Sequence, residues 1–473
     1  MRRRLGLGSR PILLIAFAFA VMADPVSSVA YAVEAALRAL DGDLTLLVPT
    51  MGLVVGIVAI VILNYRQLIA RYPGGGGAAG AVGEAFGDGW SFLPIGALIV
   101  DFVLTIAISV SAGASAVIAY FPELAPWRLA LALGLVLVVG GITLFGHLGR
   151  VVFAVMTISF IVVAVIVLAY GLAADPQPPV DAAPTAPGSA SILAVLLAFP
   201  VAMALATGVE APSSAIAQLG QLDNDGRRRF GQLTLWLTLG VVGTITIGFA
   251  VEIARLQIAL PSADSTLVAE LARIAAPAPV FAAFQVVTAL LLLAAASSSF
   301  QAGPGLLAAL ATRSIGNGNG TGHDIGILPR ALGRTNRART PYWGVALFGA
   351  LAMMIVAIGG GRDQALVLFY AVAVFISFLA GLIAMATFSK QDGRRGQFAL
   401  NVFGAVVVGF TLVANLTRGY PLVSLAATLL IASALFWMWV RAGRPRGVRN
   451  VAAEAELEAA ELAGDDPVEP AAP

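Results

Sequence analysis

The sequence predicts an all-α protein that crosses a membrane about twelve times. Hydrophobic residues make up 59% of the 473-residue chain and charged residues 11%, a balance outside the usual range of soluble globular domains. Apolar runs such as 44–62, 129–144 and 151–172 approach or reach the length of about 20 residues that spans a hydrocarbon core. Basic residues also alternate between the connections of these runs, as they do in membrane proteins.

The apolar runs define the predicted spans in order. The basic start followed by the first run imitates a signal peptide, but that run continues past Asp24-Pro25 into a second helical stretch. We therefore expect no cleavage. The predicted spans are 11–40, 44–69, 92–120, 128–146, 151–173, 191–220, 232–256, 278–311, 342–360, 364–389, 397–416 and 420–440.

Positive charge predicts the orientation of the chain in the membrane. All but six of the 28 Lys and Arg residues fall on one side of the pattern, so an even number of spans with both termini cytoplasmic satisfies it. Topology thus accounts for the basic residues, and nucleic-acid binding need not be invoked. The six on the other side are Arg38, Arg128, Arg255, Arg273, Arg362 and Arg418.

Composition excludes several kinds of site. The chain has no Cys, so disulfides, thiolate metal sites and cysteine nucleophiles are impossible. Its two His, His147 and His323, fall at span ends or in loops, and we interpret them as titratable loop residues rather than metal ligands. The sequence shows no nucleotide fingerprint and no nucleophile–base pair, so we expect a non-enzymatic protein driven by an ion gradient.

The first span, 11–40, is too long for a straight membrane helix. A helix of that length extends about 45 Å, well beyond a hydrocarbon core of about 30 Å. Pro25 removes a backbone donor and disfavours helical geometry at Asp24. We therefore predict a break at 23–28.

A second long span, 191–220, carries a similar interruption. The Thr207-Gly208 pair and Pro212 place its break near 206–211. Pro and Gly are common in transmembrane helices, but these breaks also carry polar and acidic side chains at depths where charge is costly. Paired interruptions point to a transporter binding site between inverted repeats. The polar residues at the breaks are Asp24, Ser27, Ser28, Thr207 and Glu210.

The third span has a polar face. Asp101, Thr105 and Ser109 recur every four residues, which places a carboxylate and two hydroxyls on one side of the helix. Hydroxyls alone often mediate contacts between membrane helices, but an intramembrane carboxylate normally faces a cavity or a partner. We expect no Lys or Arg at the depth of Asp101 to pair with it.

Asp24, Asp101 and Glu210 thus form a set of acids that a bound cation, protons or both must neutralise. Carboxylates, hydroxyls and free carbonyls of unwound helices are hard oxygen ligands that suit alkali cations. Like charges and desolvation disfavour three ionised carboxylates around one monovalent cation, so at least one should carry a proton, Glu210 first and Asp101 second. Tyr31 and Tyr370 are candidate further ligands, although either ring could instead fill a helix interface.

Six segments carry a family resemblance: ADPVSSVAYAVEAAL (23–37), NYRQLIARYPGGGGAAGAVGEAFG (64–87), VDFVLTIAISVSAG (100–113), ATGVEAPSS (206–214), ILPRALGRTNR (327–337) and LFYAVAVFISF (368–378). They resemble the amino acid–polyamine–organocation superfamily, and more closely its KUP/KimA-type potassium importers. The resemblance covers most of 11–440. The first and third segments are specific, whereas ATGVE is general to the superfamily.

The resemblance implies a LeuT-type fold of two inverted five-helix repeats plus two extra helices, a homodimer, and proton-coupled potassium uptake across the cytoplasmic membrane. It assigns the potassium and proton site to Asp24, Tyr31, Asp101, Thr105, Ser109, Thr207, Glu210 and Tyr370.

The expected units follow from this resemblance and from composition. The stretch 174–190 is Pro-rich, as exposed connections are, and the end of the chain shows no hydrophobic period, so we expect disorder or at most a frayed acidic helix there. The units are a cytoplasmic N-terminus (1–10), a first repeat (11–173), an extracellular connection (174–190), a second repeat (191–389), two additional helices (390–440) and a cytoplasmic tail (441–473).

Three departures from the family pattern concern the site and its regulation. Phe102 stands where the family commonly has tyrosine, so one hydroxyl is lost. The segment 297–304 lacks an acidic residue often found near Ala302, which leaves the role of the eighth span open. We expect no counterpart of the large soluble C-terminal domain of KimA-type proteins, so the resemblance does not extend to the dimer geometry and regulation of those proteins.

The main alternative is an amino-acid or polyamine permease of the same superfamily. Amino-acid members usually present a Gly-rich unwound segment that binds the substrate carboxylate. Asp24 occupies that neighbourhood and would repel an anion, although it would attract an amine. A receptor built on a transporter scaffold is disfavoured because the sequence shows no signalling domain.

Overall fold

The computed structural model describes residues 9–146, 149–176, 189–220, 222–312, 326–419 and 421–462. Within these ranges the regular elements are helices, apart from an isolated bridge between Thr335 and Pro341. Among the described residues, ten helical segments are long and apolar enough to cross a membrane, and two shorter apolar helices, Ile12–Val21 and Tyr342–Ile358, bring the number to that expected. The predicted all-α, polytopic class is confirmed.

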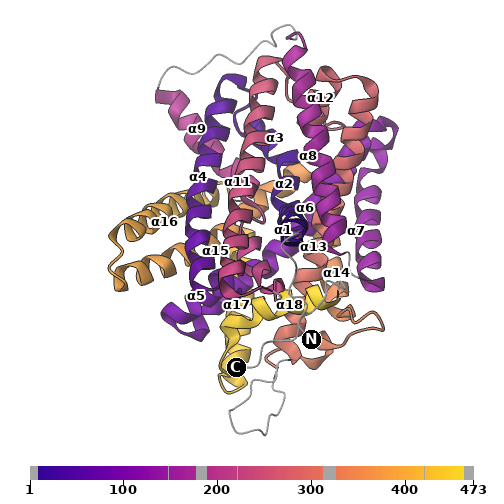
Figure 1. The fold of residues 1–473 in the computed structure, drawn as a ribbon. Coiled ribbons are helices and arrows are strands. Elements are labelled where there is room, and N and C mark those ends of the chain that lie inside the picture. Colours follow the sequence, from indigo (N-terminus) through magenta and orange to yellow (C-terminus); the bar gives the residue numbers. More distant parts are fainter. Residues whose placement is uncertain are drawn as a thin grey trace.

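The helices run mostly along one direction, with short elements at both ends of the bundle (Figure 1). In that view α5 and α18 lie across the lower end and α12 lies at the upper end. The short elements are α5 (Gly77–Phe86), η1 (Asp88–Ser91), η2 (Pro122–Trp127), η4 (Ile216–Gln218), α12 (Leu267–Ala275), η5 (Arg330–Gly333), η6 (Val448–Asn450) and α18 (Val451–Leu462). The remaining helices are α1 (Ser9–Val21), α2 (Ala23–Ser27), α3 (Val29–Ala39), α4 (Leu44–Arg71), α6 (Phe92–Tyr120), α7 (Arg128–Phe145), α8 (Arg150–Ala173), α9 (Ser189–Ala202), η3 (Met203–Ala206), α10 (Ala211–Ala215), α11 (Asn224–Arg255), α13 (Ala278–Thr312), α14 (Tyr342–Ile358), α15 (Asp363–Gln391), α16 (Arg395–Leu416) and α17 (Pro421–Arg441).

Several helices begin at side chains that accept hydrogen bonds from the first turn. The carboxylate of Asp43 accepts from the amide of Thr45 at 2.9 Å where α4 begins, and Asp223 accepts from Gly226 at 2.9 Å where α11 begins. Thr266 does the same for α12. These groups satisfy amides that have no partner within the helix.

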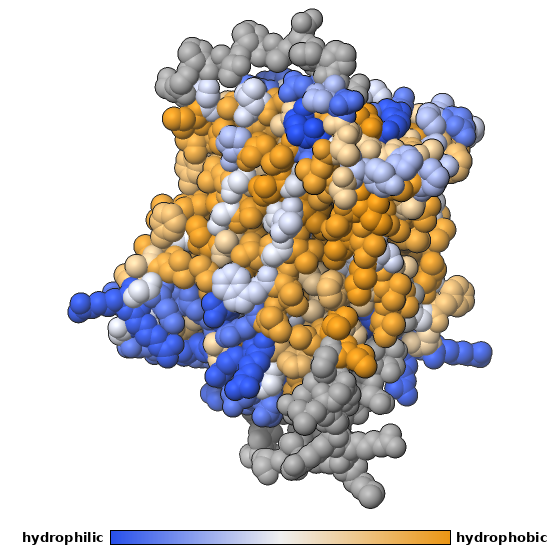
Figure 2. All heavy atoms as spheres, turned by 45° about the horizontal axis from the view of Figure 1, so that its top comes forward, coloured by the Kyte–Doolittle hydropathy of each residue, from blue (hydrophilic) through white to orange (hydrophobic). Residues whose placement is uncertain are grey.

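Burial separates central helices from peripheral ones. In α6, 83% of the most apolar stretch is buried, whereas α16 and α17 are each 28% buried in theirs. Figure 1 shows α16 at the side of the bundle, and Figure 2 shows a broad apolar belt bounded by hydrophilic residues. This arrangement suits a protein whose outer helices face lipid, since lipid chains favour apolar surface.

A buried polar network joins helices at the end that holds α12. Arg128 donates to Ser115 Oγ at 2.8 Å, and Ser115 donates to Asp363 Oδ1 at 2.8 Å. Arg128 also bonds the carbonyl of Ala263, in the connection before α12. The network therefore ties α6, α7 and α15 together.

The two predicted breaks lie where the sequence places them but differ in kind. At the first, Met22 and Ser28 separate α1, α2 and α3 while keeping right-handed helical dihedrals, so the chain is kinked rather than unwound. At the second, Thr207 is extended and Gly208 has φ +70°, so the helix is truly interrupted. A left-handed residue cannot continue a right-handed helix, which explains the difference.

Residues 451–462 form α18, so of the two alternatives expected for the tail, an acidic helix rather than disorder describes this segment. Val448, Val451, Ala452 and Ala455 are buried, and their spacing is that of one helix face. The tail approaches α5 closely: a Cβ added to Gly83 would lie only 2.6 Å from Cβ of Arg449. The apolar pattern extends over only about two turns, too short to make a stable helix by itself, so packing against the rest of the protein stabilises α18.

Candidate functional site

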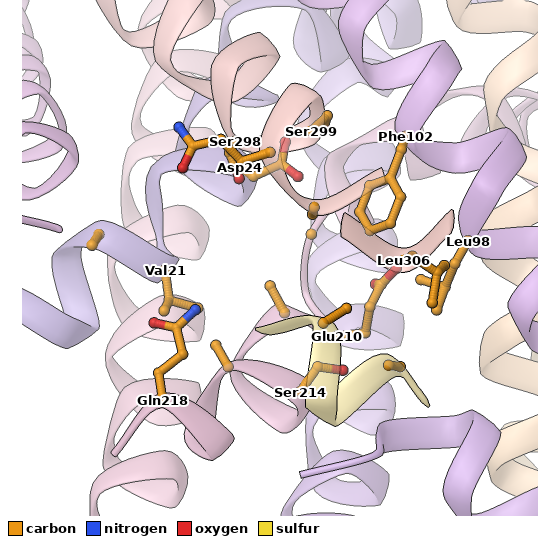
Figure 3. A pocket seen from close by; sticks show the side chains of 18 of the residues that line it. Val21, Asp24, Leu98, Phe102, Glu210, Ser214, Gln218, Ser298, Ser299 and Leu306 are labelled. Atoms are coloured by element: carbon orange, nitrogen blue, oxygen red, sulfur yellow. The ribbon is translucent and has the colours of Figure 1, made fainter. Parts of the chain in front are cut away.

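A cavity of about 150 Å³ brings the three predicted acids together. Asp24 enters it from α2, Asp101 from α6 and Glu210 from the second break, while α8, α13 and α18 supply other walls. Figure 3 shows Asp24 beside Ser298 and Ser299 at one end of the cavity, and Glu210 toward the other.

Gly208 fixes the position of Asp24. A Cβ at residue 208 would lie 2.8 Å from Cβ and Oδ2 of Asp24, closer than real Cβ contacts. The same residue has φ +70°, where L side chains are strained. Glycine is therefore required twice, for the turn and for the approach of the carboxylate.

Hydrogen bonds join the two breaks to each other. Ser28 Oγ donates to the carbonyl of Leu205 at 3.1 Å. The Tyr31 hydroxyl lies 3.5 Å from Thr207 Oγ1, which donates to the carbonyl of Ala204 at 2.6 Å. The predicted residues Tyr31 and Thr207 are thus neighbours, in the wall between the breaks rather than in the lining of the cavity.

The carbonyls of the first break already have partners. Ser27 Oγ donates to the carbonyl of Asp24 and Ser28 Oγ to that of Pro25, both at 2.7 Å. These carbonyls are therefore less available as ligands than an unwound segment would make them.

Several buried oxygens lack a hydrogen-bond partner among the described residues. They include one carboxylate oxygen each of Asp24 and Glu210 and the hydroxyls of Thr105 and Ser109, one and two turns along α6 from Asp101. Buried polar groups in proteins are usually satisfied by protein, water or an ion. These oxygens are the groups that a water or a bound solute would satisfy.

A basic residue also lines the cavity, which corrects the expectation that no Lys or Arg accompanies these acids. Arg150, the first residue of α8, contributes to the wall together with Phe153. An arginine at a span end has a side chain long enough to reach inward, which a depth estimate based on its Cα ignores.

Two of the three departures from the family pattern lie at the cavity. Phe102 and Ala302 line it, beside polar residues of α13 that sequence reasoning did not assign. The missed residues are Ser298, Ser299 and Gln301, together with Ser214 and Gln218 after the second break. The polar run SSSFQ within an apolar span was the available signal.

Some predicted residues cannot be placed. Tyr370 lies on α15, but the structure does not describe its side chain. His147, His323 and most of the connection 174–190 lie outside the described residues. In the part of the chain that the structure describes, no three His, Cys, Asp or Glu residues converge as a metal cluster would. The acids share the cavity without converging on one point.

Comparisons with known proteins identify the family. A family model described as amino acid permease matches residues 12–452. The curated potassium transporter KimA of Bacillus subtilis (strain 168) is 29% identical over 407 residues, which cover 81% of this chain. The match spans 63% of KimA, less than two thirds of its length.

Solved structures with a similar arrangement include the manganese transporter of Eremococcus coleocola. Its crystal structure with an aromatic bis-isothiourea substituted compound has a TM-score of 0.48 and 14% identity, covering 91% of this chain and 95% of that one. A variant of the same transporter has a TM-score of 0.46 and 13% identity, covering 93% and 97%.

The family match spans nearly all of the membrane helices. Because the family that matches consists of permeases, the expectation that this chain is a transporter and not an enzyme is confirmed. The chain belongs to the amino acid permease family of the amino acid–polyamine–organocation superfamily, as its sequence segments led us to expect.

Proposed function

We propose that this protein is a secondary transporter that takes up potassium ions together with protons across the cytoplasmic membrane. The proposed site consists of the cavity acids Asp24, Asp101 and Glu210, together with the predicted hydroxyl residues Tyr31, Thr105, Ser109 and Thr207, which are buried outside the lining of the cavity, and Tyr370. The similarity to a protein named as a potassium transporter supports the choice of ion.

The charge of the cavity is the observation that carries this proposal. Three carboxylates and one guanidinium line it, which leaves two negative charges in excess if every group is ionised. One potassium ion and one proton balance that excess, and neither ion does so alone. An uncompensated charge buried at this depth costs several kcal/mol, which favours loading both.

Reconstituted protein tests the coupling. In proteoliposomes loaded at neutral pH, an inward proton gradient should accelerate potassium uptake, and added potassium should acidify the lumen. The decisive quantity is the voltage at which net flux stops. If that voltage follows the potassium gradient alone and ignores the pH gradient, the protein is a channel or uniporter and the proposal is wrong.

We propose that both termini are cytoplasmic. The charge alternation supports this orientation, and basic residues assigned to the outer side engage one end of the bundle, where Arg38 bonds the carbonyl of Pro261 and Arg128 that of Ala263. Tags at both ends are tested for protease access in intact cells and in inverted vesicles. Protection of either tag inside inverted vesicles would overturn this topology.

A small amine or amino acid is the second candidate substrate. Phe102 lines the cavity, so an apolar surface lies close to the acids, and about 150 Å³ exceeds the space needed for one ion. The carboxylate of Asp24 favours an amine over an anion. Uptake of rubidium as a potassium tracer is compared with uptake of labelled putrescine and neutral amino acids; competition by an amine, with no rubidium uptake, would select this alternative.

A further inference from the structure

A second cavity, of about 360 Å³, lies between α4, α11, α15 and α16 and shares no lining residue with the acid cavity. Three arginines line it, Arg66, Arg71 and Arg394, against one carboxylate, Asp392. Amides of three glutamines complete a polar wall rich in hydrogen-bond donors. The cavity is thus suited to an anion.

Existing ion pairs neutralise only part of this charge. Arg71 donates to Glu84 at 2.7 Å, and Asp392 lies 3.8 Å from both Arg71 and Arg394. Burial would raise the pKa of Glu84, but hydrogen bonds from Arg71 and Tyr72 lower it below its ordinary value. Glu84 is therefore ionised and neutralises the charge of Arg71, whereas the positive charge of Arg66 is not neutralised in this way.

Arg66 is a cation that no described carboxylate pairs with. Its guanidinium lies 5.1 Å from the ring centroid of Trp236, and its Nε is buried without a hydrogen-bond partner among the described residues. The ring holds the guanidinium in place while leaving its edge free for hydrogen bonds. A planar donor group held in this way matches the oxygens of a phosphate.

The surroundings of the cavity are apolar on the membrane side. Leu63, Met385 and Leu400 line it, and Phe403, one turn beyond Leu400, is 57% exposed. Trp236 is itself 43% exposed on α11. A cavity suited to an anion, beside an exposed apolar surface, fits a molecule that has both a phosphate and hydrocarbon chains.

A buried amide network forms one side of the cavity and connects the helices around it. Asn64 donates to Asn401 at 3.0 Å, and Asn401 donates to Gln67 at 2.9 Å. These bonds join α4 to α16, the first of the two additional helices. A molecule bound in the cavity therefore contacts both α4 and α16.

We propose that this cavity binds the phosphate of an anionic phospholipid headgroup, with Arg66 and Arg394 as its ligands. Basic pockets between transmembrane helices are suited to such headgroups. The hydrocarbon chains lie along the exposed apolar side chains of α11 and α16. The bound lipid fastens α16 to α4 in addition to the amide network.

The full-length protein in an uncharged detergent tests the site. Thermal unfolding is followed with added phosphatidylglycerol, with phosphatidylcholine, and with inorganic phosphate. Phosphatidylglycerol should raise the unfolding temperature, whereas phosphatidylcholine and inorganic phosphate should not. In Arg66→Gln the temperature shift should fall by at least half, and phosphatidylglycerol should bind at least fivefold more weakly in titration. Lys390→Gln removes an exposed charge outside the cavity and should behave as wild type.

Each other outcome has a defined meaning. Equal stabilisation by phosphatidylglycerol and phosphatidylcholine would overturn the site, as would full retention of the shift in Arg66→Gln. Stabilisation by inorganic phosphate alone would show a small-anion site and refute a lipid. If Arg66→Gln does not fold, Arg394→Gln serves instead, since its side chain is exposed and its loss leaves the packing intact.

Discussion

Replacing Gly208 by alanine should disable transport through a contact that the structure defines. The added Cβ would lie 2.8 Å from Cβ and Oδ2 of Asp24, against an ordinary separation of about 3.5 Å, so the carboxylate must retreat by about 0.7 Å. Site geometry tolerates about 0.5 Å. The left-handed φ of +70° adds about 1 kcal/mol of backbone strain, and overpacking adds about 1–3 kcal/mol.

Gly393→Ala is the matched control for this substitution. Gly393 also has φ +70°, but a Cβ there would meet nothing within 4 Å. Both variants should therefore lose about 1 kcal/mol to backbone strain, and only Gly208→Ala should lose more stability and at least tenfold in initial uptake rate. Rates are measured in proteoliposomes and normalised to folded protein, with thermal unfolding in detergent alongside. Equal rates in the two variants would refute the role assigned to the approach of Gly208 to Asp24.

Three further predictions address the acids, the tail and the buried network. Asp24→Asn and Asp101→Asn should each abolish uptake without unfolding the protein, because a charge at 4 Å contributes up to about 4 kcal/mol at an effective dielectric constant of about 20, whereas a neutral amide is cheaper to bury; wild-type uptake in both would place the site elsewhere. Truncation after Asn450 removes α18, whose Ala452 and Ala455 line the acid cavity. Maleimide labelling of Ser214→Cys in the otherwise cysteine-free chain should therefore become at least fivefold faster, and an unchanged rate would mean that α18 does not restrict access to the cavity. Arg128→Gln should lower the free energy of unfolding by about 2 kcal/mol, because hydrogen bonds from a charged donor are lost, and Ser115→Ala should cost less; an unfolding midpoint equal to that of wild type would show that the network contributes nothing.

The sequence predicted the spans well because a bilayer constrains each span by itself. A run of apolar residues long enough for the hydrocarbon core must be helical wherever it lies in the fold, since its backbone groups have no other partners. The break at 206–211 was also predictable, because Gly208 changes the local backbone whatever surrounds it. Pro25, near the start of α2, predicted the position of the first break correctly, but not that the chain is kinked there rather than unwound.

The grouping of the acids illustrates what periodicity and spacing can and cannot provide. Asp101, Thr105 and Ser109 share a helix face because four residues advance a helix by about one turn. No local rule relates that face to Asp24, which lies on α2, or to Glu210, which lies in the second break. Their common cavity required the packing of α2, α6 and the second break, and the prediction relied on the cost of leaving each acid in lipid.

The sequence by itself determined the fold class, the approximate positions of the apolar helices, and which polar residues interrupt them, because those properties depend on local composition and on the thickness of the bilayer. Tertiary structure alone decided that Arg150 lines the same cavity as the acids, that α13 supplies polar walls, and that α18 covers part of the cavity. These contacts join residues far apart in the chain through long side chains and packed faces, and their geometry depends on the whole fold rather than on any one segment.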